Sequence, residues 1–310
     1  MALLMFNSLR GKIEDWTVYF NKAYPDLEIR EWPEIGDPAD IEYLVIGRPM
    51  LQDLPVLPNL KLMLTMLAGV EGIYNNPACP EGIPLVKGEP QGGDPSLTEY
   101  GVLHVLRHHR NLPAYQAQQR QRLWQPIEQI GPSDRRVGML GYGTMSKPIV
   151  DILLSMNFDV AAWTRTPKPD AQCEIFAGAD SFDDFLARSE IAVCLLPFTP
   201  ETKGILNAEV FAKMPEGASV INIGRGGHIV TDDLIAALDS GHLSAATLDV
   251  TEPEPLPEDS PLWDHPKVTI LPHVARRPPV SQIAPEFVDN IRRFEAGEPL
   301  QQLTHKELGY

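Results

Sequence analysis

The chain has 310 residues, of which 43% are hydrophobic and 22% are charged, so it is long enough to form two α/β domains that share a cleft. Its formal net charge of −16 repels phosphates, which argues against nucleic acid or an anionic membrane surface as a partner. The sequence contains no apolar run long enough to span a membrane. Its three cysteines lack a CxxC spacing, so they indicate neither a disulfide framework nor a metal site. We therefore expect a cytoplasmic protein.

Short apolar runs alternate with helical patterns through the first hundred residues. Strands are expected at 3–6, 27–32, 43–47, 60–67 and 84–88. This alternation is typical of a parallel sheet with crossover helices. A long helix is predicted from Ser96, which is placed to cap it with Glu99 three residues further on. We expect the chain to cross between domains there.

A second and more regular series follows. Strands are expected at 136–140, 158–163, 190–196, 218–223, 245–250 and 268–271, with helices between most of them. The two series predict an α/β fold of two domains, in which a doubly wound Rossmann-type parallel sheet is inserted into a smaller flavodoxin-like substrate domain. The expected bounds are 98–284 for the dinucleotide-binding domain and 1–97 plus 285–310 for the substrate domain, which a terminal helix completes.

The stretch VGMLGYGTMS, residues 137–146, has the pattern of a dinucleotide-binding turn between a strand and a helix. Gly141 permits the tight bend, and Gly143 lets the backbone approach a pyrophosphate at the helix start. Ser146 stands where such a turn usually has a third glycine, and a small residue is expected to be tolerated. The alternative is a strand-to-helix loop without a ligand.

The end of the next strand indicates which dinucleotide binds. Enzymes that use NAD usually have Asp or Glu there, which bonds the ribose hydroxyls and repels the additional phosphate of NADP. This chain has WTRTPK, in which Arg165, Lys168 and the hydroxyls of Thr164 and Thr166 suit a phosphate. We predict NADP(H) in preference to NAD(H), unless Arg165 is only a solvated loop residue.

Three side chains with complementary chemistry each follow a predicted strand: Arg225, Glu254 and His273. Parallel strands end at the same edge of a sheet, so these residues can converge although they are far apart in sequence. Hydride transfer to a keto carbon leaves an alkoxide, which requires a nearby acid and a positive group. Because TEPEP contains two glutamates, Glu252 is the alternative carboxylate.

The chain resembles the D-isomer-specific 2-hydroxyacid dehydrogenases, most closely their glyoxylate/hydroxypyruvate reductase A branch. The segments that carry the resemblance are LPNLKLMLTMLAGVEGI, GMLGYGTMSKPI, WTRT, LLPFTPETKGIL, NIGRGGHIV, DDLIAALDSGHL, LDVTEPEPLPEDSPLW and LPHVA. It implies NADPH-dependent reduction of small 2-keto acids, with glyoxylate and hydroxypyruvate as leading substrates. The alternatives are a dehydrogenase for a bulkier or dicarboxylic keto acid and a non-catalytic dinucleotide-sensing binding protein.

The resemblance also implies roles for individual residues. Arg225 binds the substrate carboxylate and keto oxygen, His273 donates the proton, and Glu254 orients His273 and keeps it protonated near neutral pH. Further cofactor contacts are implied at Thr144, Met145, Leu196, Pro197, Thr202, Ile223, Gly224 and Asp249. The loop MLAGVEGI matches the family's substrate-carboxylate loop at Ala68, Gly69 and Val70.

Two regions depart from the family pattern. Arg48 follows YLVIG, where related reductases carry an aromatic residue nearby, and Arg276 and Arg277 follow LPHVA, where relatives are more neutral. These arginines either recognise a second anionic group on the substrate or are surface charges. The identity of the keto acid therefore stays open.

The stretch AYQAQQRQRLWQP, residues 114–126, resembles the arm by which family members form two-fold dimers. The resemblance implies a homodimer in which Trp124 packs against the partner or reaches into its cleft. The alternative is an amphipathic helix packed on its own chain.

Overall fold

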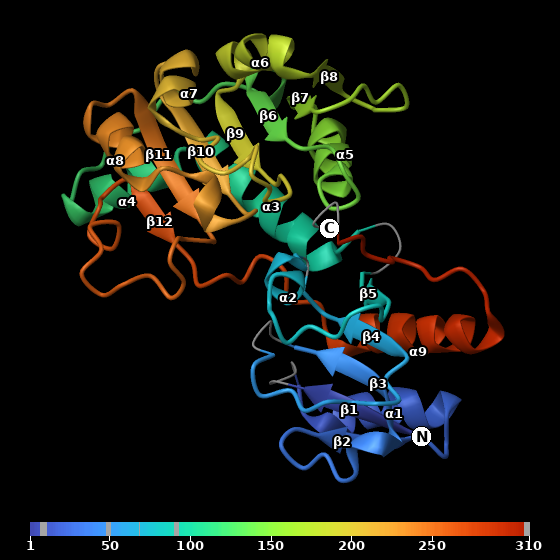
Figure 1. Ribbon diagram of the computed structural model, residues 1–310. Coiled ribbons are helices and arrows are strands. Elements are labelled where there is room, and N and C mark those ends of the chain that lie inside the picture. The colour runs from blue at the N-terminus through green and yellow to red at the C-terminus, as the bar shows by residue number, and fades with distance from the viewer. Residues whose placement is uncertain (7–10, 48–50, 68, 90–92, 307–310) are drawn as a thin grey trace. The chain divides into compact units, whose positions relative to one another are not determined.

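The computed structural model describes residues 1–6, 11–47, 51–67, 69–89 and 93–306. The chain forms two compact units, one of Met1–Gln91 with Pro278–Tyr310 and the other of Gly92–Arg277. Each has its own parallel sheet (Figure 1). The bounds expected from the sequence fall inside helices α3 (Pro95–His109) and α9 (Val280–Ala296), each of which belongs whole to one unit.

The first unit contains a five-stranded sheet in the order β2-β1-β3-β4-β5. All neighbouring strands are parallel, and the order is that of flavodoxin-like folds. The strands are β1 (Ala2–Phe6), β2 (Glu28–Glu31), β3 (Ile41–Ile46), β4 (Leu62–Thr65) and β5 (Leu85–Lys87).

Side chains alternate between the two faces of this sheet, and both faces are covered. Leu3 and Met5 pack in one core with Trp16 of α1 (Ile13–Ala23) and Phe287 of α9. The intervening residues of β1 pack in a second core with Ile73 of the short helix α2 (Glu71–Tyr74). Two-sided burial explains why the strands read as nearly continuous apolar runs.

The second unit contains a seven-stranded sheet in the order β12-β11-β10-β9-β6-β7-β8. All its neighbouring strands are parallel, and the switch point lies between β6 and β9, as in a Rossmann fold. The predicted doubly wound architecture is therefore confirmed. The strands are β6 (Arg136–Leu140), β7 (Asp159–Thr164), β8 (Glu174–Ala177), β9 (Ile191–Cys194), β10 (Ala218–Asn222), β11 (Leu243–Leu248) and β12 (Val268–Ile270).

Helices cover both faces of the larger sheet (Figure 1). One core contains residues of α3 and α5 (Lys147–Ser155), and the other contains residues of α6 (Phe182–Arg188), α7 (Ala208–Lys213) and α8 (Thr231–Asp239). Helix α4 (Leu112–Arg120) follows α3 and contains no buried residue. No helix in the described part of the chain is long and apolar enough to cross a membrane.

The cap of α3 differs from the expected one. Asp94, not Ser96, is the N-cap, and its side chain accepts hydrogen bonds from the amides of Ser96 and Leu97. Pro95 occupies the first turn, where its missing N–H costs nothing and its fixed φ suits the helix. The helix therefore begins before the serine that was expected to cap it.

Candidate active site

The glycine turn after β6 has the conformation that a dinucleotide site requires. Gly141 has φ of 103°, and a Cβ on it would lie 3.1 Å from the carbonyl oxygen of Leu195. A Cβ on Gly143 would meet no described atom within 4 Å, so space lies open beside this part of the backbone. The turn therefore fits a bound pyrophosphate, for which the amides at the start of α5 are the natural donors.

Ser146 shows how the turn accommodates the missing third glycine. Its side chain is 2% exposed, and its Oγ accepts a hydrogen bond of 2.9 Å from the amide of Gly143. Between them, Thr144 is exposed and Met145 is partly buried. The buried hydroxyl of Ser146 thus stabilises the turn by binding the amide of Gly143.

The side chains after β7 divide into two kinds. Arg165, Thr166 and Lys168 are exposed, whereas Thr164 is 5% exposed and its hydroxyl donates to the carbonyl of Thr166 at 2.8 Å. Thr164 therefore shapes the loop, and the two cations remain at its surface. No carboxylate stands in WTRTPK, so the segment suits a phosphate better than it suits an unmodified ribose.

The loops after β9 and β10 complete this edge of the sheet. Thr202 donates its hydroxyl to the carbonyl of Pro197 at 2.8 Å and accepts from the amide of Thr199 at 2.9 Å. Leu196 is partly buried beside this loop. After β10, Ile223 and Gly224 are buried.

The three residues with complementary chemistry follow adjacent strands of the sheet: Arg225 follows β10, Glu254 follows β11 and His273 follows β12. His273 Nδ1 lies 2.9 Å from Glu254 Oε2, and because a carboxylate only accepts, Nδ1 carries the proton. Nothing in the described part of the chain bonds Nε2. Glu252 is exposed, and Glu254, not Glu252, is the carboxylate that bonds the ring.

Arg225 is held from both ends. Its Nη1 donates to the carbonyl of Gly224 at 2.8 Å, and its amide donates to Nδ1 of His228 at 3.1 Å. His228 is fully buried, and its Nε2 lies 3.4 Å from the carbonyl of Pro197. The sequence pattern gave no reason to single out His228, because its role depends on a loop about thirty positions away.

The electrostatics of the pair favour an ionised Glu254. Burial alone raises the pKa of Glu254, but the hydrogen bond from His273 and the charge of that ring outweigh it and leave the pKa below its usual value. Arg225 contributes a smaller lowering. A further hydrogen bond of 3.2 Å from the amide of Thr251 fixes Oε1.

Asp249 is a buried hydrogen-bond acceptor. It is 1% exposed and accepts hydrogen bonds from the hydroxyl of Tyr100 at 2.8 Å and from the amides of Val274 and Ala275 at 2.8 and 2.9 Å. Its carbonyl also accepts from the amide of His273 at 2.8 Å. The side chain therefore anchors the segment after β12.

The candidate substrate loop lies in the first unit. Gly69 precedes Val70, which is fully buried and forms the N-cap of α2. The amides of both residues have no hydrogen-bond acceptor within the described ranges. Ala68 and Arg48 lie outside the described residues.

The two arginines after LPHVA differ in exposure. Arg276 is 8% exposed, and its Nε lies 3.0 Å from Oδ2 of Asp94, whereas Arg277 is exposed. Arg276 is thus engaged with a carboxylate of its own unit.

A Rossmann sheet whose carboxyl edge presents a glycine turn, a phosphate-suited loop and a His–Glu pair beside an arginine defines a dinucleotide-dependent oxidoreductase. The model for "D-isomer specific 2-hydroxyacid dehydrogenase, NAD binding domain" matches residues 102–275. The chain belongs to the D-isomer specific 2-hydroxyacid dehydrogenase family.

Individual relatives agree with this assignment. Glyoxylate/hydroxypyruvate reductase A of Serratia proteamaculans is 36% identical over 302 residues, which are 96% of each chain. A D-isomer specific 2-hydroxyacid dehydrogenase from Xanthobacter autotrophicus, solved with NADPH and MES, has a TM-score of 0.88 at 36% identity over 99% of both chains. An NADPH-dependent glyoxylate/hydroxypyruvate reductase from Sinorhizobium meliloti, solved with NADP and sulfate, has a TM-score of 0.89 at 32% identity over 100% of both chains.

Proposed function

We propose that this protein is an NADPH-dependent reductase that converts small 2-keto acids, with glyoxylate and hydroxypyruvate as its main substrates, to 2-hydroxy acids. The observation that carries the proposal is the His273–Glu254 pair, 2.9 Å apart, at the sheet edge that also presents Arg225 and the glycine turn. The names of the relatives from Serratia and Sinorhizobium support the same activity.

The chain's own residues fit NADP(H). The backbone at Gly141 and Gly143 admits a pyrophosphate, and the exposed Arg165 and Lys168 suit the additional phosphate. When bound, the cofactor supplies the hydride. The NADPH and NADP seen with two structural neighbours support this preference over NAD(H).

His273 is the proton donor to the substrate's keto oxygen in this proposal. Glu254 holds Nδ1 and fixes the orientation of the ring, so that Nε2 is the nitrogen that faces the ligand. Because the pKa of Glu254 is lowered, this group favours its ionised form, which accepts the hydrogen bond from Nδ1 of His273. The donor and its orienting group are thus coupled.

Arg225 binds the substrate through its guanidinium. Its planar donors match a carboxylate and an adjacent keto oxygen, and its positive charge stabilises the oxygen as negative charge develops. The bonds to Gly224 and His228 hold the residue before the substrate arrives. In the first unit, the amides of Gly69 and Val70 are a further proposed site for the substrate carboxylate.

The deciding experiment is the initial rate of NADPH oxidation, and separately of NADH oxidation, with glyoxylate, hydroxypyruvate, pyruvate, phenylpyruvate and oxaloacetate. We expect glyoxylate and hydroxypyruvate with NADPH to give the highest kcat/KM. A preference for oxaloacetate would favour the dicarboxylate alternative, although the engagement of Arg276 with Asp94 argues against it. No turnover with either cofactor would favour a binding protein.

Variants connect that activity to the site. His273→Ala and Arg225→Ala are expected to lower kcat by about 10²- to 10⁴-fold. Their Kd for NADPH, measured by the change in tryptophan fluorescence on binding, should stay that of the wild type. Glu254→Gln should also lower kcat, whereas Glu252→Gln, two residues away and exposed, should not. Wild-type turnover by the His273 variant would refute the assignment. His305→Ala, at an exposed histidine, is the control for loss of an imidazole.

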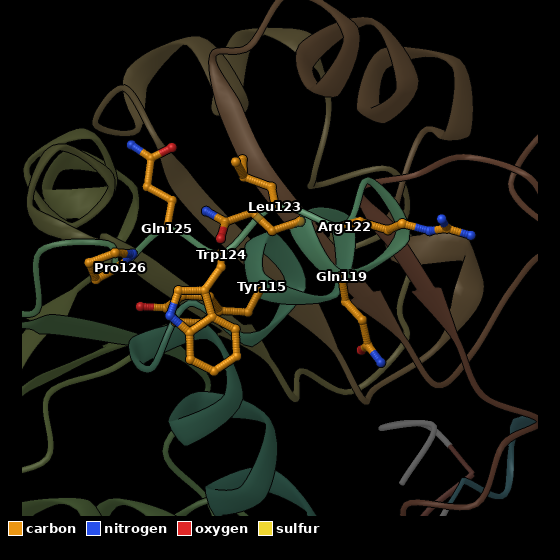
Figure 2. A pocket seen from close by; sticks show the side chains of 8 residues that line it. Tyr115, Gln119, Arg122, Leu123, Trp124, Gln125 and Pro126 are labelled. Atoms are coloured by element: carbon orange, nitrogen blue, oxygen red, sulfur yellow. The ribbon is translucent and has the colours of Figure 1, made fainter.

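We also propose a homodimer formed through the arm of residues 114–126. Trp124 is fully exposed, and the arm borders a groove of about 670 Å³ (Figure 2). The lining residues are Tyr115, Gln118, Gln119, Arg122, Leu123, Trp124, Gln125 and Pro126. An exposed tryptophan beside such a groove suits burial by a second copy of the chain.

Sedimentation velocity tests the dimer. The wild-type chain is expected to sediment as a dimer, and Trp124→Ala should shift the equilibrium toward the monomer. A monomeric wild-type protein at micromolar concentration would contradict the proposal.

The three free thiols, Cys79, Cys173 and Cys194, support a reducing compartment such as the cytosol as the location of the protein.

A further inference from the structure

The segment that contains His273 needs support from outside itself. Residues 271–279 form neither helix nor strand, and His273 has φ of 53°, in the left-handed region that residues other than glycine seldom adopt. A side chain on such a segment keeps a fixed direction only when neighbouring groups hold the backbone. The structure provides two sets of such groups.

The first set holds the beginning of the segment to the end of β11. The carboxylate of Asp249 accepts from the amides of Val274 and Ala275, and its carbonyl accepts from the amide of His273. The hydroxyl of Tyr100, in the second turn of α3, donates to the same carboxylate at 2.8 Å. Asp249 therefore connects the His273 segment to α3.

The second set holds the end of the segment to the start of the same helix. Arg276 lies with its Nε 3.0 Å from Oδ2 of Asp94, and the amide of Arg277 donates to Oγ of Ser96 at 3.2 Å. Oδ1 of Asp94 meanwhile accepts from the amide and the hydroxyl of Ser96, at 2.9 and 2.5 Å. One carboxylate thus caps α3 and binds Arg276.

We propose that Asp94 and Arg276 are positioning residues for the proton donor: their buried ion pair fixes the far end of the His273 segment against α3. Asp94 is 0% exposed and Arg276 is 8% exposed. Their Nε and Oδ2 atoms are at ion-pair distance but not in hydrogen-bonding alignment, so the attraction is mainly one of charge. The proposal rests on the proposed function, in which His273 is the proton donor.

Stability alone is a poor explanation for this pair. Removing two charges from water offsets most of their attraction, and apolar residues of similar size often replace such a pair without loss of stability. Breaking the pair by removing one partner is harmful because the other charge stays buried. A positioning role accounts for why both charges lie at the end of this segment.

The test compares single and double variants. Arg276→Met keeps the apolar stem but leaves Asp94 as an unpaired buried charge, so both the thermal midpoint and kcat should fall. Adding Asp94→Asn removes that charge and keeps the oxygen that caps α3, so the double variant should recover thermal stability. We expect its kcat to remain about 10- to 100-fold below wild type, because a displacement of the donor of about 1 Å has an effect of this size. The KM for NADPH should not change.

Arg276→Lys retains a positive charge at the site and is expected to recover part of kcat. Arg188→Met is the matched control, since Arg188 also pairs with a carboxylate, that of Asp159, with 14% of its side chain exposed, but at the opposite edge of the sheet. It should lower the thermal midpoint without changing kcat. Full kcat in the stable double variant would overturn the positioning role.

A readout independent of turnover separates this proposal from the proposed function. In protein labelled with ¹⁵N-histidine, the ring signals of His273, assigned by their loss in His273→Asn, should be single and sharp in the wild type. They should broaden or divide in the double variant and stay unchanged in Arg188→Met. If the wild type reduces no keto acid but its signals behave in this way, the proposed function fails while the anchoring of the segment stands. Unchanged signals in the double variant would refute the anchoring.

Discussion

Arg165 is the side chain on which the choice of cofactor should depend. It is exposed immediately after β7, with no carboxylate in the surrounding WTRTPK. Arg165→Ala is expected to raise the KM for NADPH about 10- to 100-fold, because a charge-assisted bond to the phosphate contributes about 1.5–3 kcal/mol. The KM for NADH should change little, since NADH lacks that phosphate. Steady-state kinetics with both cofactors measure the difference.

Arg110→Ala is the matched control, because Arg110 is also exposed but lies at the C-terminal end of α3. It should leave both KM values as they are. Equal weakening of NADPH and NADH by Arg165→Ala would contradict a phosphate-binding role and assign the arginine to general loop structure.

At the level of single residues, a pair of interacting side chains could be predicted from the sequence where both residues follow the ends of predicted strands. Glu254 and His273 could be paired because both follow strands of one parallel sheet. The resemblance predicts that Asp249 contacts the cofactor, and the structure adds that its carboxylate accepts hydrogen bonds from Tyr100 and Ala275, which the sequence did not indicate. Contacts between positions so far apart carry no signal in a single sequence, and the pairing of Arg276 with Asp94 was missed for the same reason.

At the level of elements, the 3-10 turn Gly226–His228 is packed more tightly than any side chain would permit. A Cβ on Gly226 would overlap the backbone carbonyl of Thr251 and approach the amide of Glu252 at 2.6 Å. Gly226→Ala is therefore expected to displace the loop that carries Glu254, with a loss of kcat of at least about 10²-fold. The thermal midpoint should fall by several degrees. Kinetics and calorimetry measure the two effects.

Gly131→Ala provides the comparison. Gly131 has φ of −71°, and a Cβ there would lie 3.5 Å from its nearest neighbour, an ordinary van der Waals distance. This variant should retain wild-type kcat and stability. If Gly226→Ala behaved in the same way, the turn and the loop would be able to separate without cost, and their close approach would have no bearing on Glu254.

The elements that the sequence predicted best are the strands buried on both sides. Their apolar runs carry a strong signal because neither face meets water, as in β6 and β10, which lie in the middle of the sheet. The edge strand β8 was missed, since its four residues include an exposed glutamate and have no fully buried side chain. The start of α3 was misplaced because Ser96 and Asp94 are both competent caps and only Pro95 distinguishes them.

At the level of the whole molecule, buried histidines make stability depend on acidity. Desolvation lowers the pKa of His104 from 6.5 to about 4 and that of His108 from 6.5 to about 3. Between those folded-state pKa values and pH 6.5, the unfolded chain therefore binds more protons than the folded chain. The free energy of unfolding is highest above pH 6.5 and decreases as the pH falls below it. We expect the thermal midpoint to decrease steadily from pH 7 to pH 4.

His104→Leu isolates one contribution to that decrease. Both ring nitrogens of His104 are buried without a hydrogen-bond partner among the described residues, so leucine should stabilise the protein by about 1 kcal/mol at pH 7. The difference from wild type should grow as the pH falls, to an added amount on the order of 3 kcal/mol near pH 4. His305→Gln, at an exposed position, should follow the wild-type curve. A constant difference at all pH values would show that His104 does not titrate in this way.

The two-unit organisation was predictable because two series of alternating strands and helices are separated by one long helical pattern. The right-handed crossovers of parallel sheets then limit the strand orders that are possible, without fixing one of them. The exact residues at which the chain passes between units were harder to predict from the sequence. Helices α3 and α9 begin only a few residues after those points, and no break in the sequence pattern marks them.

The ion pair of Asp94 and Arg276 also joins the two ends of the second unit. The two residues lie almost at the two ends of the continuous stretch Gly92–Arg277, and the pair brings those ends together. A stretch of chain whose ends meet can be inserted into a surface loop of another protein without stretching its host. The second unit is thus one continuous stretch of chain with its ends held together, which is the geometry that a domain inserted into another domain requires.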